Sequence, residues 1–314
     1  MDGFMRCPTL RELPAPPPGK IGWPWNEETP ELPDAMPDGT AWPKISIVTP
    51  SFNQGEFIEE TIRSVLLQGY PNIEYVVMDG GSADVSVEII RKYAPWLTYW
   101  FSGPDKGHGQ ALNKGFSRCS GDLFGWINSD DLYFINAFAR LAEVSRRTRG
   151  DFFYGDSITR YVVEKKMSYF IANPVFGRFL TVGGIIYQHS SFWTKALHEP
   201  VREDLNCAVD SELWFRLIPK AKRIIYVNYP LAVVNSHSST KTNNIKYQDQ
   251  WVADNRFVGK IHDLRREGMR KYLLYFNTPL YWLDYRASRF VYSKLRRDAR
   301  KFELMTRYFP GFRT

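Results

Sequence analysis

The sequence predicts an α/β protein built on a mixed, mainly parallel sheet flanked by helices, and two observations support this. From Lys44 onward, short apolar runs alternate with amphipathic stretches, which is the pattern of strand–helix–strand units. Of the 314 residues, 44% are apolar and 24% charged, so the chain can bury a core and lacks the composition of a disordered protein.

Strands and helices are expected to alternate along the chain. Residues 45–49 form an apolar run that Pro50 and the next polar residues end, and apolar residues then recur at helical spacing from 57 to 66. The same reasoning predicts strands over 74–78, 97–101 and 123–127, and helices over 85–93, 110–118 and 137–147. Beyond these the pattern is less regular, and we expect strands near Phe152, Val162 and Ile185 and a helix over 210–217.

Three regions are expected along the chain. Ten of the twenty prolines fall at or before Pro43, so residues 1–43 are predicted to be an extended, loosely draped arm. Residues 44–250 form the main domain. Residues 251–314 form a helical extension rich in aromatic and basic residues. From Arg256 to Thr314 there are fifteen Lys and Arg against five Asp and Glu, a net charge of +10 that exceeds the +7 of the whole chain.

The cysteines and the N-terminal residues indicate a cellular compartment. The three cysteines are odd in number and form no CxxC pair, which argues against a disulfide framework or a thiolate zinc site and favours a reducing compartment. The first residues lack a basic stretch followed by an apolar one, and no eighteen apolar residues run together. We therefore expect neither a secretory signal nor a membrane-spanning segment.

Polar, acidic loops follow three of the predicted strands, at the ends where open α/β sheets bind ligands. These loops are Thr49–Asn53, Asp79–Asp84 and Asn128–Asp131. The glycine-rich GxGxxG and GxxxxGK[ST] phosphate-binding motifs are absent. Acids at these positions suit a substrate whose phosphates arrive with Mg²⁺ or Mn²⁺, because these cations bridge carboxylates to phosphates. Asp130 is the predicted metal ligand.

Ordinary structural roles remain open for these acids. Asp130 and Asp131 could instead cap the helix that follows, because Asp is favoured at helix N-termini. Asp79 begins an Asp-Gly-Gly sequence that is also common in turns.

Four motifs together resemble the inverting nucleotide-sugar glycosyltransferases of family 2, which have the GT-A fold. The resemblance spans roughly Lys44 to His237 and depends on the order and spacing of Thr49-Pro50-Ser51-Phe52-Asn53, Asp79-Gly80-Gly81-Ser82-Ala83-Asp84, Pro104-Asp105-Lys106-Gly107 with Ala111-Leu112-Asn113-Lys114-Gly115, and Asn128-Ser129-Asp130-Asp131. It implies a GT-A-like sheet and the transfer of a sugar from a nucleoside-diphosphate donor, with a UDP-sugar favoured.

The resemblance also implies roles for particular residues. Those matching the nucleotide and donor site are Pro50, Phe52, Asn53, Asp79, Asp105, Lys106, Asn113, Asn128 and Ser129, with Asp79 accepting a hydrogen bond from the base. Asp130 matches the retained carboxylate of the Asp-x-Asp metal motif, whose first position is Asn128 here. His237 matches a loop histidine that closes over the diphosphate as a further metal ligand or phosphate donor, with Lys241 assisting; a solvated loop histidine is the alternative. Relatives often have Asp where this chain has Gln110.

An inverting transfer needs a base that takes the proton of the acceptor hydroxyl. Asp210, in Ala208-Val209-Asp210-Ser211-Glu212, matches the family's acid at the start of a helix and is the predicted catalytic base. Glu212 is the reserve candidate, and a helix-capping role is the alternative for Asp210. The preceding Gln188–Phe192 stretch resembles a strand that faces the donor sugar or the acceptor.

The expected function is sugar transfer to a glycan or lipid-linked oligosaccharide, in polysaccharide or cell-surface glycan synthesis, at the cytoplasmic face of the cell membrane. A net charge of +10 interleaved with aromatics could hold the extension on an anionic bilayer, since each basic residue contributes about 1 kcal/mol there. The extension could instead pack its aromatics on the core. Such a sequence also suits single-stranded nucleic acid, but no nucleic-acid partner is expected, because lipid-linked acceptors already account for membrane proximity.

Two other functions remain open. A nucleotidyltransferase that makes nucleotide sugars would carry a glycine-rich, basic loop where this chain has Pro50-Ser51-Phe52-Asn53. A non-catalytic nucleotide-sugar- or glycan-binding scaffold would tolerate loss of Asp130 and Asp210.

Overall fold

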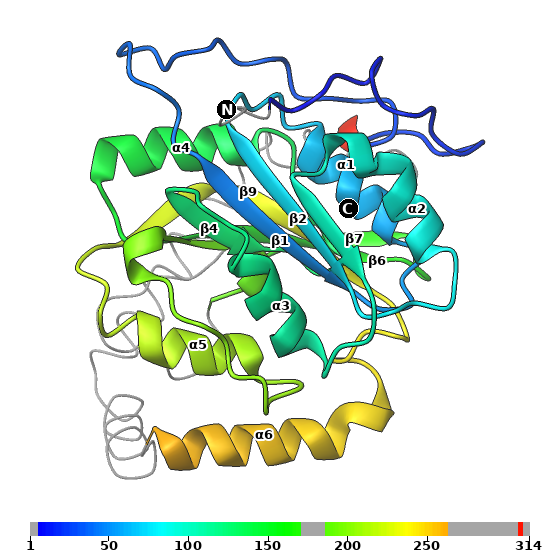
Figure 1. Cartoon of the computed structure of the whole chain (residues 1–314), viewed down its shortest axis with the longest axis vertical. Coiled ribbons are helices and arrows are strands. Elements are labelled where there is room, and N and C mark those ends of the chain that lie inside the picture. Colours follow the sequence, from blue (N-terminus) through cyan, green and yellow to red (C-terminus); the bar gives the residue numbers. More distant parts are fainter. Residues whose placement is uncertain (1–5, 171–185, 263–306, 310–314) are drawn as a thin grey trace.

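The computed structural model describes residues 6–170, 186–262 and 307–309, and within them nine strands form one twisted sheet (Figure 1). The strands are β1 Ile45–Ser51, β2 Ile73–Asp79, β3 Tyr99–Ser102, β4 Leu123–Trp126, β5 Leu132–Tyr133, β6 Phe152–Tyr161, β7 Lys166–Phe170, β8 Ser191–Thr194 and β9 Ile224–Ser236. The helices are α1 Ile58–Leu66, α2 Ser86–Tyr93, α3 His108–Phe116, α4 Ala137–Thr148, α5 Val209–Leu217 and α6 Gln248–Ile261. Short 3₁₀ turns occupy Ala94–Trp96, Gln188–Ser190, Lys195–Leu197 and Ile245–Tyr247.

The sheet is mainly parallel, as the sequence predicts. Its order is β3-β2-β1-β4-β8-β6-β9-β5, with β7 paired to β6. Strands β1 to β4 run parallel, and β8 is antiparallel to both β4 and β6. Because β9 is parallel to β6, it points in the same direction as β1 to β4. The carboxyl ends of β1, β2, β4 and β9 therefore meet at one edge of the sheet.

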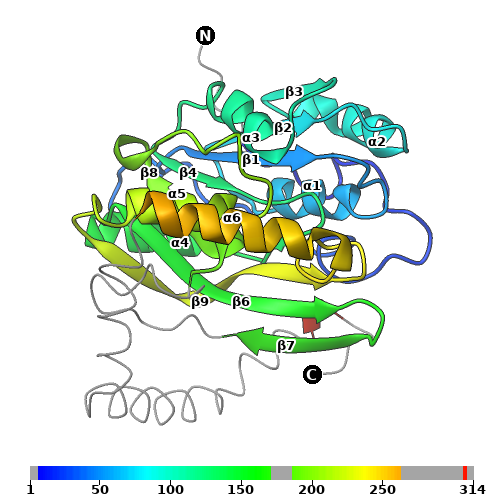
Figure 2. The ribbon, with the colours of Figure 1, turned by 90° about the horizontal axis from the view of Figure 1, so that it is seen from below.

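Helices cover both faces of the sheet and produce two apolar cores (Figures 1 and 2). On one face, α1, α2 and α4 pack against the strands, with Ile62, Ile90 and Phe138 among the buried residues. On the other face, α3, α5 and α6 contribute Leu112, Leu213 and Val258. The two cores brace the sheet from both sides and make its carboxyl edge a rigid support.

The predicted elements from residue 45 to 148 are found with boundaries shifted by a few residues. The expected strand over 97–101 begins at Tyr99, because Ala94–Trp96 form a 3₁₀ turn first. One strand, β6, runs from Phe152 to Tyr161, and Ile185 lies outside the described residues. Sequence reasoning missed β9, whose apolar residues are interrupted by Asn228 and Pro230 and whose pairing with β6 shifts register near Gly155.

The N-terminal segment lacks helices and ladder strands over residues 6–43, as expected, but it is packed rather than loosely draped. Trp23, Trp25 and Trp42 are buried. The fully buried Arg63 of α1 donates hydrogen bonds to the backbone carbonyls of Pro14, Pro24 and Trp25. Carbonyl acceptors and indole rings therefore make this segment part of the first core.

The expected boundary between residues 250 and 251 falls inside α6. Trp251, Phe257 and Val258 of this helix pack on the second core, so α6 is joined to the main domain. The rest of the predicted extension, apart from residues 307–309, lies outside the described residues. Among the helices of the described ranges, none is both long and apolar enough to cross a bilayer.

Candidate functional site

Asp130 and His237 come together at the carboxyl edge of the sheet, although 107 positions separate them in the sequence. Asp130 follows β4 and His237 follows β9, and the parallel direction of these strands brings the two loops side by side. His237 Nε2 lies 3.3 Å from Asp130 Oδ2. The imidazole stacks on the Phe57 ring with 4.3 Å between centroids, and its buried Nε2 has no hydrogen-bond partner among the described residues.

The turn that carries Asp130 is held by backbone and side-chain hydrogen bonds from β9 and α1. Asn235 Nδ2 donates to the Asp130 carbonyl at 2.6 Å, and the Asn235 N–H donates to Asp131 Oδ1 at 3.1 Å. Thr61 Oγ1 donates to the Asp131 carbonyl at 2.8 Å. Helix α4 begins only at Ala137, so neither aspartate caps it and the capping alternative fails.

A buried ion pair supports Asn235 from behind. Arg160 donates to both carboxylate oxygens of Glu60, at 2.8 and 2.5 Å, and through Nε to Asn235 Oδ1 at 2.6 Å. Trp25 Nε1 also donates to Glu60, at 3.2 Å. Because Asn235 bonds the Asp130 carbonyl, this network fixes the loop that carries the candidate metal ligand.

Two groups close to Asp130 have pKa values that are shifted in opposite directions. Burial, together with the neighbouring charge of Asp130, raises the pKa of Asp131 well above its usual value, and Asp131 Oδ1 is occupied by the Asn235 N–H. His108 Nε2 lies 3.2 Å from Asn128 Oδ1, and burial with the positive charge of Lys241 lowers the pKa of His108 to about 4. Asp130 is therefore left as the carboxylate of this loop that can face a cation.

Asp79 organises the loop after β2. Its Oδ2 accepts from the Gly81 N–H, the Ser82 N–H and Ser102 Oγ, and its Oδ1 accepts from Ser82 Oγ at 2.5 Å. Asp79 is only 1% exposed. Reading of a nucleobase by Asp79 stays a prediction. The observed role is to hold the loop that lines this edge.

The loops after β1 and β2 are tied together. Asn53, at a left-handed φ of 52°, donates its N–H to Ser82 Oγ and accepts from the Ala83 N–H through its side chain. Pro50 is buried in β1, whereas the Phe52 ring is 58% exposed and free to stack on a ligand.

Asn113 does not face the sheet edge with free donors. Its Nδ2 donates to the Val201 carbonyl and to Glu203, and its Oδ1 accepts from the Val201 N–H, each at 2.9 Å. Asp105 accepts from the Gly107 N–H at 2.7 Å, and Lys106 is exposed. Asn128 is half-buried and Ser129 buried beside Asp130. The donor contacts expected of these residues stay predictions.

Asp210 and Glu212 differ sharply in their surroundings. Glu212 is 1% exposed and bound to Arg216 and His262, so it is a structural anion rather than a free base. Asp210 lies in the first turn of α5 and does not cap it, because Ala208 is the N-cap and makes no side-chain capping bond. Asp210 Oδ1 accepts from the adjacent Ser211 N–H at 2.8 Å, and burial raises the pKa of Asp210.

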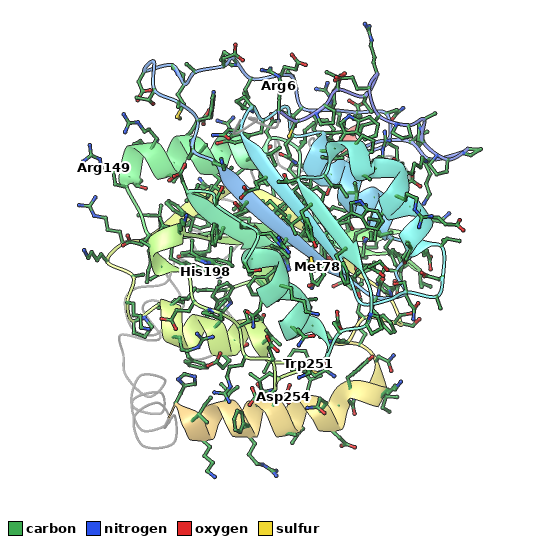
Figure 3. All side chains as sticks on the ribbon, in the orientation of Figure 1. Arg6, Met78, Arg149, His198, Trp251 and Asp254 are labelled. Atoms are coloured by element: carbon green, nitrogen blue, oxygen red, sulfur yellow. The ribbon has the colours of Figure 1, made fainter. Side chains whose placement is uncertain are left out.

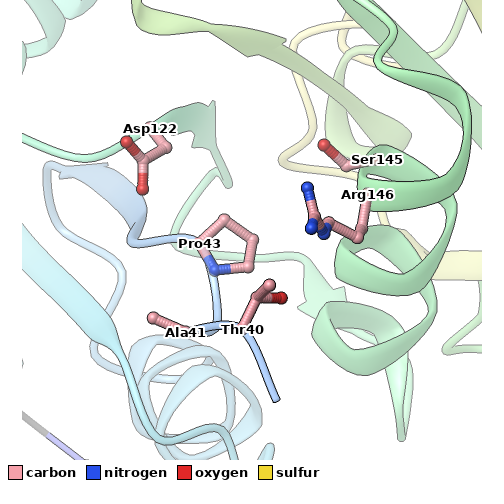
Figure 4. Close-up of a pocket in the computed structure, with 6 residues that line it drawn as sticks. All are labelled: Thr40, Ala41, Pro43, Asp122, Ser145 and Arg146. Atoms are coloured by element: carbon pink, nitrogen blue, oxygen red, sulfur yellow. The ribbon is translucent and has the colours of Figure 1, made fainter. Parts of the chain in front are cut away.

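Two hollows of the described surface lie away from the acidic loops. One of about 260 Å³ is lined by Thr40, Ala41, Pro43, Asp122, Ser145 and Arg146, before the starts of β1 and β4 and thus at the amino edge (Figure 4). Another of about 340 Å³ lies between α4 and the start of β9. None of the residues that line these two hollows belongs to the acidic loops after β1, β2 and β4.

Sequence reasoning missed the residues that support this site. Glu60, Arg160 and Asn235 lie on elements far apart in the sequence, and no local pattern marks them. His108 directly follows the quoted Pro104–Gly107 motif, so its position was the one available signal. Lys241, four residues after His237, bonds through Nζ to Asn206 ahead of α5. Burial lowers the pKa of Lys241, and the negative charge of Asp130 offsets part of that shift.

Comparisons with known proteins agree on one family. Residues 46–196 match the model of the family described as Glycosyl transferase family 2. An uncharacterized glycosyltransferase of Mycobacterium tuberculosis is 39% identical over 95 residues, covering 30% of this chain and 36% of that protein. One from Rickettsia prowazekii is 24% identical over 234 residues, covering 67% of this chain and 70% of that protein. The chain thus spans about a third of the length of the M. tuberculosis relative.

Solved structures share the fold. Residues 1–349 of TarS from S. aureus superpose with a TM-score of 0.55 at 19% identity, covering 73% of this chain and 68% of that one. The same protein in complex with UDP-GlcNAc gives 0.55 at 17% identity, with 73% and 69% covered. The likeness confirms the predicted α/β class with its mainly parallel sheet.

Proposed function

We propose that this chain, whose residues 46–196 belong to glycosyl transferase family 2, transfers a sugar with inversion from a nucleoside-diphosphate donor to an acceptor hydroxyl. The family and the GT-A-like fold expected from the four motifs are both confirmed. The observation that supports the reaction is the convergence of Asp130 and His237 at the carboxyl edge of the sheet, with Lys241 linking them to the segment before Asp210.

The donor is proposed to be a UDP-sugar. The exposed Phe52 ring offers a stacking surface beside the loop that Asp79 organises, which suits a nucleobase. TarS, which shares the fold, has been solved with UDP-GlcNAc and with UDP. Lys106, exposed in the loop after β3, is proposed to bind a donor phosphate.

Asp130 and His237 fit a divalent cation. The buried His237 Nε2 has no hydrogen-bond partner among the described residues and faces the Asp130 carboxylate. The described residues contain no cluster of three His, Cys, Asp or Glu side chains that could hold a metal by themselves. Two protein ligands are enough for Mg²⁺ or Mn²⁺ when phosphate oxygens and water complete the shell. When bound, the cation would offset negative charge on the leaving diphosphate.

Asp210 is the proposed base. Burial raises the pKa of this carboxyl, which strengthens it as a proton acceptor for the attacking hydroxyl. Its Oδ2 makes no hydrogen bond within the described ranges and remains available for that proton. Glu212 is not available in this way, because Arg216 and His262 occupy its oxygens.

Calorimetry of nucleotide binding tests the donor site. UDP and GDP are titrated with and without Mn²⁺ into the wild type, Asp130→Ala and the control Asp151→Asn, whose carboxylate binds backbone amides at the opposite edge of the sheet. We expect one nucleotide to bind in a Mn²⁺-dependent manner to the wild type and the control but not to Asp130→Ala. Failure of both nucleotides to bind the wild type would contradict the proposal and favour the scaffold alternative.

The role of Asp210 is tested with sugar derivatives of whichever nucleotide binds, by measuring how fast the nucleotide is released. Asp210→Asn should lower the rate of nucleotide release by at least about 100-fold, while nucleotide affinity is unchanged. A variant with near wild-type turnover would exclude Asp210. Formation of nucleotide sugar from a sugar phosphate and a nucleoside triphosphate would instead support a nucleotidyltransferase.

The acceptor is proposed to be a glycan or lipid-linked oligosaccharide at the cytoplasmic membrane face. Exposed Ile245, Val252 and Ile261 accompany exposed Arg256 and Lys260 on and beside α6, a combination suited to an anionic bilayer. Sedimentation with vesicles of anionic and of neutral lipids tests this placement. Binding to anionic vesicles that Val252→Asp weakens would support it, and equal recovery in the supernatant with both lipids would contradict it.

A further inference from the structure

We infer that Asn113 and Asp254 are positioning residues that hold the segment 199–208 from two sides and thereby aim Asp210. The inference depends on the proposed function, since Asp210 is the base proposed there. The segment leads directly into α5, in whose first turn Asp210 lies. Its conformation therefore determines where the Asp210 carboxylate points.

Helix α3 holds the first side of the segment. Asn113 bonds both the N–H and the carbonyl of Val201, and its second N–H binds Glu203. Gln110 Nε2 adds a bond to Glu203 at 3.3 Å. The backbone of Arg202 approaches so closely that a Cβ on Gly109 would lie 2.6 Å from its carbonyl oxygen. Helix α3 and the segment are thus in direct backbone contact.

The side chain of Asn113 has no N–H left for a donor sugar. A carboxamide carries two N–H donors, and the Val201 carbonyl and Glu203 occupy both. A donor contact would require the segment to detach from α3. The family resemblance assigns Asn113 to the donor, whereas its observed bonds assign it to the segment that carries Asp210.

Helix α6 holds the second side. Asp254 Oδ2 accepts from the backbone N–H groups of Asn206, Cys207 and Ala208, at 2.9, 2.7 and 3.4 Å. These amides precede the first turn of α5 and would otherwise lack partners. Gln250 holds the other oxygen of Asp254 at 2.6 Å, and Figure 3 shows Asp254 on the side of α6 that faces the domain. The carboxylate is 4% exposed.

Two arginines make further contacts with this arrangement. The Arg202 guanidinium lies 5.0 Å from the centre of the Phe257 ring on α6. Arg216 of α5 binds Glu199 and the Pro200 carbonyl at the start of the segment. Residues 199–203 are therefore held by α3, α5 and α6, and residues 206–208 by α6, on both sides of the stretch that leads into Asp210.

The test compares Asn113→Ala, Asp254→Ala and Asp254→Asn with two matched controls. Asn72→Ala removes an amide that bonds the Trp42 carbonyl, and Asp151→Asn alters a carboxylate that bonds the Lys222 and Arg223 amides, both away from α5. For each protein we measure nucleotide affinity by calorimetry, kcat for nucleotide release, and hydrogen exchange of peptides covering 199–213.

We expect Asn113→Ala and Asp254→Ala to lower kcat by about 10- to 100-fold, because small displacements of a catalytic group have effects of this size. Nucleotide affinity should stay within about twofold, and exchange over 199–213 should rise. Asp254→Asn keeps an acceptor oxygen and should restore part of the kcat that Asp254→Ala loses. The controls should change neither kcat nor exchange in this segment.

Three outcomes would overturn the inference. A nucleotide affinity that falls tenfold in Asn113→Ala, with kcat retained at saturation, would return Asn113 to the donor site. Unchanged exchange over 199–213 in the Asn113 and Asp254 variants would show that these residues do not hold the segment. Equal kcat for Asp254→Asn and Asp254→Ala would show that the acceptor oxygen is irrelevant. Failure of the proposed function is a separate result, visible as absent nucleotide binding and turnover in the wild type, and the exchange measurement still decides the inference.

Discussion

Arg160→Met should destabilise the protein strongly, because it leaves the charge of Glu60 buried without its partner. The side chains of Arg160 and Glu60 are 8% and 10% exposed, and two hydrogen bonds join them. Breaking a buried pair from one side costs about 3–5 kcal/mol. The Trp25 indole still donates to Glu60, whereas Asn235 Oδ1 loses its donor, so we expect a loss of about 4 kcal/mol.

Urea and thermal unfolding measure this loss. With about 2 °C per kcal/mol for a chain of this size, the melting temperature should fall by about 8 °C. The matched control is Arg146→Met, which removes an ion pair with Asp38 whose side chains are 47% and 48% exposed. Because solvent screens this pair, its loss should leave the free energy of unfolding almost unchanged.

A double-mutant cycle with Glu60→Gln isolates the pair itself. Once Arg160 is gone, removing the Glu60 charge should be favourable, and the coupling should reach about 2 kcal/mol. A loss below about 1 kcal/mol for Arg160→Met, or simple additivity in the cycle, would refute the idea that this pair supports the Asp130 loop.

Three further predictions concern the two cores. Gly115→Ala should lower the free energy of unfolding in urea by about 1–3 kcal/mol, because the new Cβ would overlap Val48 on β1. In Gly259→Ala on α6 the new Cβ meets no atom within 4 Å, so this variant should be more stable by up to about 1 kcal/mol. Equal effects of the two substitutions would contradict this reasoning. Trp23→Ala should lower the free energy of unfolding by about 3–5 kcal/mol, because Trp23 is 1% exposed and its indole donates to the Tyr133 carbonyl. Ile21→Ala, at a 60% exposed position, should change stability by less than about 0.5 kcal/mol. If the N-terminal segment were loosely draped, the two substitutions would have similar effects. Burial, together with the charge of Arg216, lowers the pKa of His198 from 6.5 to about 4. Below pH 6.5 the unfolded chain therefore binds a proton at His198 that the folded chain does not bind, and the free energy of unfolding falls as the pH drops. Between pH 7 and 5, the wild type should lose about 1 kcal/mol more than His198→Gln, a figure reduced for partial exposure, and identical pH profiles would refute it.

The strand ends that carry Asp79 and Asp130 were predictable from the sequence. Each lies at the boundary between an apolar run and a polar loop, and that boundary is a local property of the chain. The order of parallel strands then requires these loops to meet at one edge. The resemblance to glycosyl transferase family 2 followed from four such motifs in the same order and spacing.

Partners of individual side chains were not predictable in the same way. Asn113 matched a donor-binding position, yet the structure shows its amide bound to Val201 and Glu203. The 1–43 segment has no apolar periodicity, yet within its described residues Trp23, Trp25 and Trp42 are buried. Both results depend on which surfaces meet after folding, which spacing along one element does not reveal.

The class of fold and the edge of the sheet where a site is expected could be predicted from the sequence, because the alternation of apolar and polar residues is visible over a few neighbouring positions. Asp130 was a candidate because it follows a predicted strand, and Asp210 because of the family resemblance. The folded chain was needed to show that β9 places His237 and Asn235 beside Asp130, and that Asp254 of α6 accepts backbone N–H groups at the start of α5. These contacts join residues tens of positions apart. Their geometry arises from strand order and helix packing, which are properties of the whole folded chain.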